Sequence, residues 1–124
     1  MVAHPSSNPI WTNLVPSPVP IDKGVLIFAD CLAIGLYEEL ACRGYLIPRL
    51  ETLFGSTWKS ILFSSILFAL LHISKGITGV VTSGLLGVIW GIAFCATRRI
   101  WPVVIAHALW DYVVATHLYS LLPP

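Results

Sequence analysis

Charged residues are scarce in this sequence of 124 residues. Lysine and arginine together number 7, aspartate and glutamate number 6, and charged residues make up 10% of the chain. A water-soluble domain has about 25% charged residues, so this chain has too few to cover a surface that faces water. Because 56% of its residues are hydrophobic, the composition predicts a protein that lies in a membrane.

Several other features are also missing. The net charge is only +1, and the sequence has neither a basic patch nor the aromatic array with which proteins bind nucleic acids. We therefore expect no nucleic-acid partner. The 3 cysteines, Cys31, Cys42 and Cys95, contain no CxxC pair and all lie in apolar segments. They are expected to be packing residues, without a disulfide framework.

The chain begins with a polar, proline-rich segment. Proline has no backbone N–H and disfavours a helix interior, so the density of prolines before Ile21 predicts an extended or interfacial arm over residues 1–21. Trp11 is expected at the level of the lipid headgroups. The arm lacks a basic start followed by an apolar run, which excludes a signal peptide.

The remaining residues, 22–124, are predicted to form one helical domain. A membrane span needs about 20 residues, so the length and pattern predict an all-α, multi-pass transmembrane bundle of about four helices. The first helix is expected to end before Pro48, because the residue before a proline avoids the α conformation. Gly55 and Ser56 are expected to form a turn, with Ser56 or Thr57 capping the second helix. The expected helices cover residues 22–47, 57–73, 77–97 and 101–121.

Small residues recur along one face of the third expected helix. Ser83, Gly87 and Gly91 are spaced four apart, a pattern that lets a neighbouring backbone approach closely. We expect this face to pack against another helix. The alternative is a substrate groove floored by glycine.

Two carboxylates and a guanidinium interrupt the first apolar run, at Glu38, Glu39 and Arg43. Such groups are costly to place in lipid and usually mark a functional site. Glu39 and Arg43 are four residues apart and can pair within the helix. Glu38 is turned about 100° away, which makes it the candidate working carboxylate. The alternative is that both glutamates only neutralise Arg43.

Polar residues also interrupt the second and fourth apolar runs, at His72 and at His107 with Asp111. His107 and Asp111 share a helix face. Alternatively, His107 and Asp111 form a polar contact between helices, and His72 lies at the membrane–water interface. His4 and His117 are expected to be bystanders.

We expect Glu38, His72, His107 and Asp111 to converge on one site at membrane depth. A rise of about 1.5 Å per residue places Glu38 roughly 13 Å and His72 roughly 22 Å from the side that carries the two tight loops. The same count gives roughly 9 Å for His107 and roughly 15 Å for Asp111. All four depths fall within a hydrocarbon core about 30 Å thick.

A carboxylate and an imidazole can activate a water molecule, and a second imidazole can stabilise an oxyanion. The same side chains, Glu38, His72 and His107, could instead bind zinc and leave one position open. Either arrangement hydrolyses an amide bond. The metal-free reading is favoured, with no cofactor, because zinc ligands must lie within about 2.0–2.2 Å of one point whereas the expected depths differ.

Three short motifs follow one another along the chain. They are EExxxR at Glu38, Glu39 and Arg43, FxxxH at Phe68 and His72, and HxxxD at His107 and Asp111. In this order, on apolar segments, they resemble the CAAX prenyl protease and bacteriocin-processing family, also called the ABI family. The similarity extends over residues 22–115, including the stretch from Gly44 to Leu50. In the third motif, aspartate is less common in the family than asparagine.

The resemblance implies a helical-bundle intramembrane endopeptidase of the glutamic type. Glu38 and His72 would activate water, and His107 with Asp111 would bind the oxyanion or orient the scissile carbonyl. Glu39 and Arg43 would support them. The expected substrate is a membrane-associated protein or peptide. Prenylated C-termini, bacteriocin leaders and C-terminal sorting signals all remain open.

Two other classes of function are open. The first is a non-catalytic immunity or adaptor protein of the membrane that keeps the motifs as structure. The second is a b-type haem protein with His72 and His107 as axial ligands, which the adjacent carboxylates disfavour. The chain is shorter than is usual for the family, which leaves a complete enzyme, a fragment and an oligomer as alternatives.

Basic residues are distributed unevenly between the ends of the expected helices. Arg49, Lys59, Arg98 and Arg99 lie on the side of the two tight loops, whereas Lys23 and Lys75 lie on the other. The positive-inside rule therefore places the tight loops in the cytoplasm, and we expect a multi-pass protein of the cell membrane.

Overall fold

The structure is a computed structural model that describes residues 20–116. This part of the chain is helical and contains no β-strand, which confirms the all-α prediction. The elements are α1 (Ile21–Glu39), a π-helical segment (Leu40–Leu46), α2 (Ile47–Phe54), α3 (Thr57–Leu71), a 3₁₀ turn (Ile73–Lys75), α4 (Gly76–Thr97) and α5 (Trp101–Thr116). The predictions for Trp11, His4, His117 and the end of the last helix fall outside the described residues.

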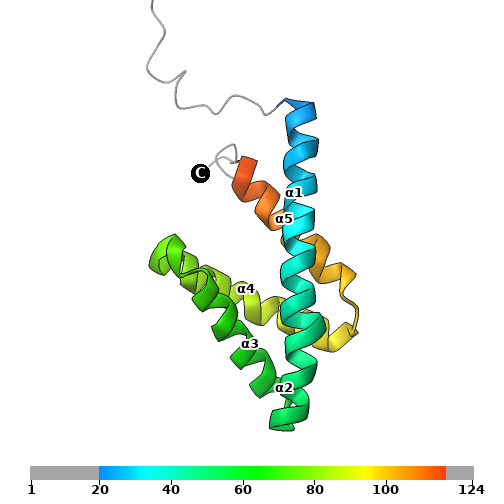
Figure 1. Cartoon of the computed structure of the whole chain (residues 1–124), viewed down its shortest axis with the longest axis vertical. Coiled ribbons are helices and arrows are strands. Elements are labelled where there is room, and N and C mark those ends of the chain that lie inside the picture. Colours follow the sequence, from blue (N-terminus) through cyan, green and yellow to red (C-terminus); the bar gives the residue numbers. More distant parts are fainter. Residues whose placement is uncertain (1–19, 117–124) are drawn as a thin grey trace, which may run out of the picture.

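The helices are arranged as two packed pairs, with the first helix extended through α2 (Figure 1). α1, the π-helical segment and α2 run as one long rod, and α5 packs along α1. α3 and α4 form an antiparallel hairpin, whose α3 also contacts α2. The bundle of about four helices predicted from the sequence is therefore present, with the first rod longer than expected.

The prediction that the first helix ends before Pro48 is wrong. The chain stays helical through Pro48 as far as Phe54. Gly55 then ends the helix with a left-handed φ of 61°. The N–H of Ile47 bonds to the carbonyl of Cys42, five residues back, so the bonding register has already changed when the chain reaches proline. Pro48 then lies in the first turn of α2, where a missing N–H is tolerated.

The turn predicted at Gly55 and Ser56 is confirmed. The Ser56 side chain accepts a hydrogen bond from the Lys59 N–H, so Ser56 caps α3. At its other end α3 stops at Leu71, two residues earlier than predicted. His72 leaves the helical conformation there, with φ −98° and ψ 15°.

Two of the small residues of α4, Gly87 and Gly91, face α3, as predicted. A Cβ added to Gly87 would lie 3.2 Å from the Cα of Ser65, and one added to Gly91 would lie 3.0 Å from Cγ2 of Ile61. Because Gly87 and Gly91 have no side chains, the backbone of α4 packs directly against α3 at these two positions.

We expect Gly87→Leu to destabilise the protein by about 1–3 kcal/mol, as overpacking does, because the neighbouring atom is backbone and cannot rotate away. The thermal unfolding midpoint in detergent measures the effect. Val81→Leu is the control, since Val81 is on the same helix and 56% exposed. Equal midpoints for Gly87→Leu and Val81→Leu would contradict this packing.

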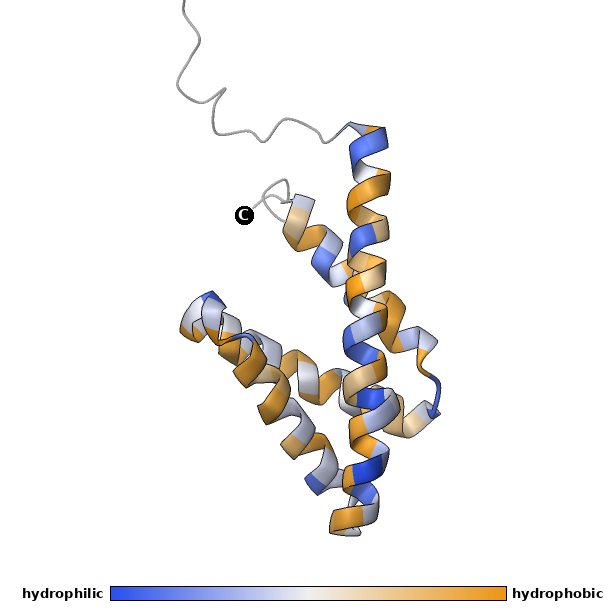
Figure 2. Cartoon of the chain, viewed as in Figure 1, coloured by the Kyte–Doolittle hydropathy of each residue, from blue (hydrophilic) through white to orange (hydrophobic). Residues whose placement is uncertain are grey.

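The molecule buries polar groups and exposes apolar ones. Glu39 and Arg43 are 0% and 1% exposed, whereas Leu71 and Ile77 are 76% and 83% exposed. Figure 2 shows hydrophobic residues along all of the helices. Lipid solvates such a surface and water does not.

One helical stretch within residues 20–116 is long and apolar enough to cross a membrane. It joins the 3₁₀ turn to α4 and spans Ile73–Thr97, 25 residues. The apolar helix α3 has 15 residues, fewer than the roughly 20 that a span usually needs. The cysteines Cys31, Cys42 and Cys95 are free thiols, as predicted.

An ion pair joins the end of the first rod to the connection between α4 and α5. Arg98 donates two hydrogen bonds of 2.7 Å to Glu51, one to each carboxylate oxygen, and Thr57 donates another of 2.7 Å. These bonds, chiefly those from Arg98, lower the pKa of Glu51 from 4.5 to about 2. Both tight loops therefore lie at the same end of the bundle.

Stability should depend on pH through this pair. Because the pKa of Glu51 is lowered, the ion pair stabilises the fold fully above about pH 4.5, and this stabilisation is lost as the pH falls toward 2. Arg98 is 53% exposed, so we expect Arg98→Gln to cost only about 0.5–1 kcal/mol at neutral pH. The difference from wild type should shrink in acid-unfolding measurements between these pH values. Arg99→Gln is the control, and a pH-independent difference would contradict the assignment.

Candidate active site

Glu39 is the centre of a buried polar cluster. Its Oε1 lies 3.1 Å from Nη1 of Arg43 on the next turn and 2.8 Å from Nδ1 of His107 on α5. The pairing with Arg43 was predicted from the spacing, but the bond to His107 was not. Glu39 therefore joins the first rod to α5 at the motif histidine.

Arg43 extends this cluster to α4 and α3. Its Nη2 donates to the carbonyl of Gly87 at 3.0 Å, and its guanidinium lies 4.9 Å from the centre of the Phe68 ring. Trp90 in turn stacks on His107, with ring centres 4.4 Å apart. Arg43 thus contacts a carboxylate, a carbonyl and an aromatic face, which together stabilise a charge that lipid could not solvate.

The ring of His107 presents its second nitrogen to two further carboxylates. Nε2 lies 3.5 Å from Oε2 of Glu38 and 3.5 Å from Oδ2 of Asp111. These separations exceed the 2.7–3.2 Å of a well-formed hydrogen bond. Because the Glu39 carboxylate only accepts, His107 donates from Nδ1, and Nε2 is the atom available to a substrate.

His72 lies where α3 ends, and its Nδ1 is 2.9 Å from the carbonyl of Phe68. A carbonyl only accepts hydrogen bonds, so Nδ1 carries the proton and Nε2 of the neutral ring has a free lone pair. The ring also packs against Phe68, with centres 4.7 Å apart. His72 is thereby held as a proton acceptor.

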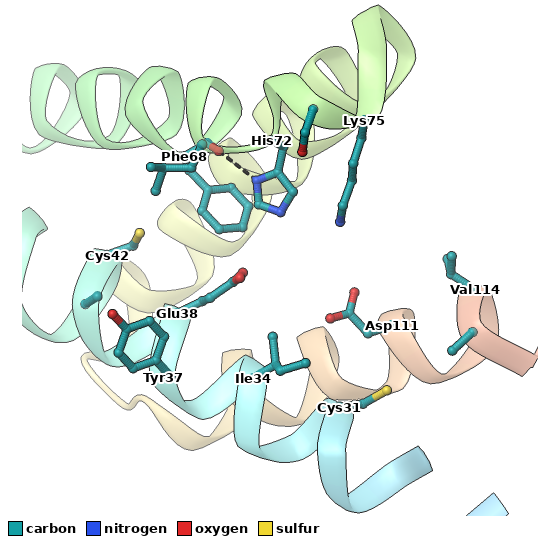
Figure 3. A pocket seen from close by; sticks show the side chains of 14 residues that line it. Cys31, Ile34, Tyr37, Glu38, Cys42, Phe68, His72, Lys75, Asp111 and Val114 are labelled. Carbon is teal, nitrogen blue, oxygen red and sulfur yellow. Dashed lines mark hydrogen bonds between the residues drawn. The ribbon is translucent and has the colours of Figure 1, made fainter.

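A cavity of about 630 Å³ opens between the first rod, the end of α3 and α5. Figure 3 shows Glu38, His72 and Asp111 on its walls, with the ring of His72 and the carboxylate of Glu38 turned into the space. Its side-chain lining is otherwise mostly apolar, with residues such as Ile34, Leu71 and Val114. A second cavity of about 190 Å³ also contacts His72 and Asp111 and reaches His107.

Three of the four predicted site residues, Glu38, His107 and Asp111, lie in contact with one another. The fourth, His72, lines both of the cavities that these residues border. The estimated depths of Glu38 and His107 differ by only about 4 Å, and Oε2 of Glu38 lies 3.5 Å from Nε2 of His107.

Glu38, His72 and His107 are the ligands that the sequence suggested for zinc. Within residues 20–116, no three histidine, cysteine, aspartate or glutamate side chains are grouped so that they could hold one metal ion. The site as built does not fit a three-ligand zinc centre, and we derive no step through a metal.

Two features of the site had no signal in the motifs. The π-helical segment directly after Glu39 is of a kind often found at functional sites, and only Pro48 hinted at irregular backbone. The contacts of Arg43 with Gly87 and Phe68 join different helices, so no spacing along the chain reveals them.

Comparison with protein families shows where these motifs belong. The sequence model described as type II CAAX prenyl endopeptidase Rce1-like matches residues 20–113, most of the chain and nearly all of the described structure. No curated protein and no solved structure matches the chain. The resemblance inferred from the three motifs is confirmed, and the chain belongs to the Rce1-like family of type II CAAX prenyl endopeptidases, which are membrane-integral peptidases.

Proposed function

We propose that this chain cleaves a peptide bond of a membrane-associated substrate as a glutamic-type endopeptidase. The observation that supports it best is the grouping of Glu38 and Asp111 around Nε2 of His107, each at 3.5 Å. His72 faces the same cavity with a free lone pair. A purely structural cluster does not require polar groups to be turned into an accessible cavity.

In the proposed reaction, Glu38 and Nε2 of His72 hold a water molecule in the cavity. The water oxygen attacks the carbonyl carbon of the scissile bond, and its proton passes to Glu38. When the tetrahedral intermediate collapses, the C–N bond breaks and Glu38 returns this proton to the leaving nitrogen. The carboxylate is thereby regenerated for the next cycle.

His107 would stabilise the oxyanion of the intermediate. Its Nδ1 donates to Glu39, so a proton on Nε2 makes the ring a cation whose charge Glu39 and Asp111 balance. An oxyanion entering beside Nε2 would accept this proton's hydrogen bond. Asp111 and the stacked Trp90 would hold the ring in position, and Arg43 would hold Glu39.

The natural substrate can be sought by comparing cells that carry wild-type protein or Glu38→Ala. We expect new N-termini or C-termini of membrane proteins in wild-type cells that are absent from the variant. An unchanged set of termini, together with a normal cellular phenotype of the variant, would favour the non-catalytic adaptor reading.

We propose that the chain crosses the membrane several times, with both tight loops in the cytoplasm. Glu51 and Arg98 already place these loops at one end. A cysteine at position 53, where the native leucine is 74% exposed, should react with a membrane-impermeant reagent only from the cytoplasmic side. Asp22→Cys should react only from the opposite side. The reverse pattern would overturn this orientation.

A further inference from the structure

Lys75 is a feature of the cavity that the proposed reaction does not use. Within the described chain, it is the one lysine or arginine that lines the cavity of about 630 Å³, and it also borders the smaller one. Figure 3 shows its amine extended into the space beside His72. The two acids on these walls, Glu38 and Asp111, make no ion pair with Lys75 within residues 20–116.

The backbone around Lys75 directs this side chain. Gly76 has φ 74° and ψ −175°, a conformation that is essentially restricted to glycine. A Cβ added to Gly79 would collide with Cβ of Lys75. The sharp turn at Gly76 and the bare backbone at Gly79 therefore let the lysine fold back over the start of α4 and reach the cavity.

The charges on the cavity wall suggest what this amine meets. Glu38 and Asp111 would repel an anionic ligand, and Lys75 is placed to offset them. A cavity of about 630 Å³ is in the size range of sites for drug-sized molecules, so it holds only a few residues of an extended peptide. Lys75 follows His72 by three residues in one compact turn, so an anion at Lys75 would lie close to the scissile bond.

We propose that Lys75 binds a carboxylate of the peptide substrate, within about three residues of the scissile bond at roughly 3.3 Å per residue. The carboxylate is either the C-terminus of the substrate or an Asp or Glu side chain. This binding site rests on the peptide cleavage proposed above and adds a residue that selects among substrates.

The test uses full-length protein in detergent with Glu38→Gln, which retains bound peptides. Four N-acetylated heptapeptide libraries are offered, with free or amidated C-termini and with or without Asp and Glu at the random positions. Retained peptides are quantified by mass spectrometry. We expect at least one carboxylate-bearing library to be retained about fivefold more than the neutral one, and the pattern identifies which carboxylate is bound.

Further variants separate substrate binding from a general role in the membrane. Lys75→Gln should abolish the preference, Lys75→Arg should keep it, and Gly79→Ala should weaken it by displacing the lysine. Lys59→Gln, at the other end of α3, is the matched control and should leave it unchanged.

Equal retention of all four libraries, or a preference that survives Lys75→Gln, would overturn the proposal and leave Lys75 as an interfacial lysine facing lipid phosphates. Retention is measured with Glu38→Gln and therefore does not depend on cleavage. A wild-type protein that prefers carboxylate peptides but cleaves none would contradict the endopeptidase proposal and leave the carboxylate site standing.

Discussion

Glu38→Gln is expected to lower peptide-bond cleavage by about 10²–10⁴-fold, and to leave the fold intact. Glutamine has nearly the same shape as glutamate but cannot accept the proton of the attacking water. Glu38 is 27% exposed and lines the cavity, and its 3.5 Å approach to His107 is longer than a well-formed hydrogen bond, so we expect the fold to depend little on its charge. Cleavage by purified protein and the thermal unfolding midpoint are measured side by side.

The control for Glu38→Gln is Asp30→Asn. Asp30 is an exposed acid on the same helix and lines neither cavity that contains His72, so cleavage should remain at the wild-type rate. A chelator should also have little effect on the wild-type protein. Zinc at one ion per chain, lost together with activity on chelation and restored with it, would contradict the glutamic mechanism.

The largest effect on stability is expected from Arg43→Gln, at about 3–5 kcal/mol. The change leaves the carboxylate of Glu39, 0% exposed, without the guanidinium that pairs with it. It also removes the bond to the carbonyl of Gly87 and the contact with the Phe68 ring. A lowered thermal unfolding midpoint in detergent would report this loss, and Arg49→Gln, on the exposed face of α2, is the control.

A double variant identifies the cause of that loss. If the cost arises from an unpaired buried charge, Glu39→Gln/Arg43→Gln should be more stable than Arg43→Gln alone, because both charges are then absent. Additive losses in the two single variants would show instead that Arg43 acts mainly through Gly87 and Phe68.

Contacts within one helix could be predicted from the sequence. The pairing of Glu39 with Arg43, and the shared face of His107 and Asp111, follow from a spacing of four residues. The close approach of α4 to α3 follows from Ser83, Gly87 and Gly91 in the same way. The convergence of the three polar segments was also expected, because lipid offers their side chains no other partner.

The individual side-chain partners across helices, and the irregular backbone, could not be predicted. Glu39 was interpreted as the partner of Arg43 alone, whereas it also binds His107 on α5. No spacing encodes that contact, since it depends on how α1 and α5 cross. The end assigned before Pro48 was wrong because the rule for proline assumes the bonding register of an α-helix, which the π-helical segment changes.

The π-helical segment also sets the rotational phase between the two halves of the first rod. Each residue of an α-helix turns the chain by about 100°, and each residue of the wider π-helix turns it by less, so the 7 residues Leu40–Leu46 coiled as an α-helix would rotate α2 relative to Glu38. Ile47 and Leu50, which are 0% and 7% exposed, would then face away from the core. The side of α2 that meets the core therefore depends on the π-helical bonding pattern of this segment.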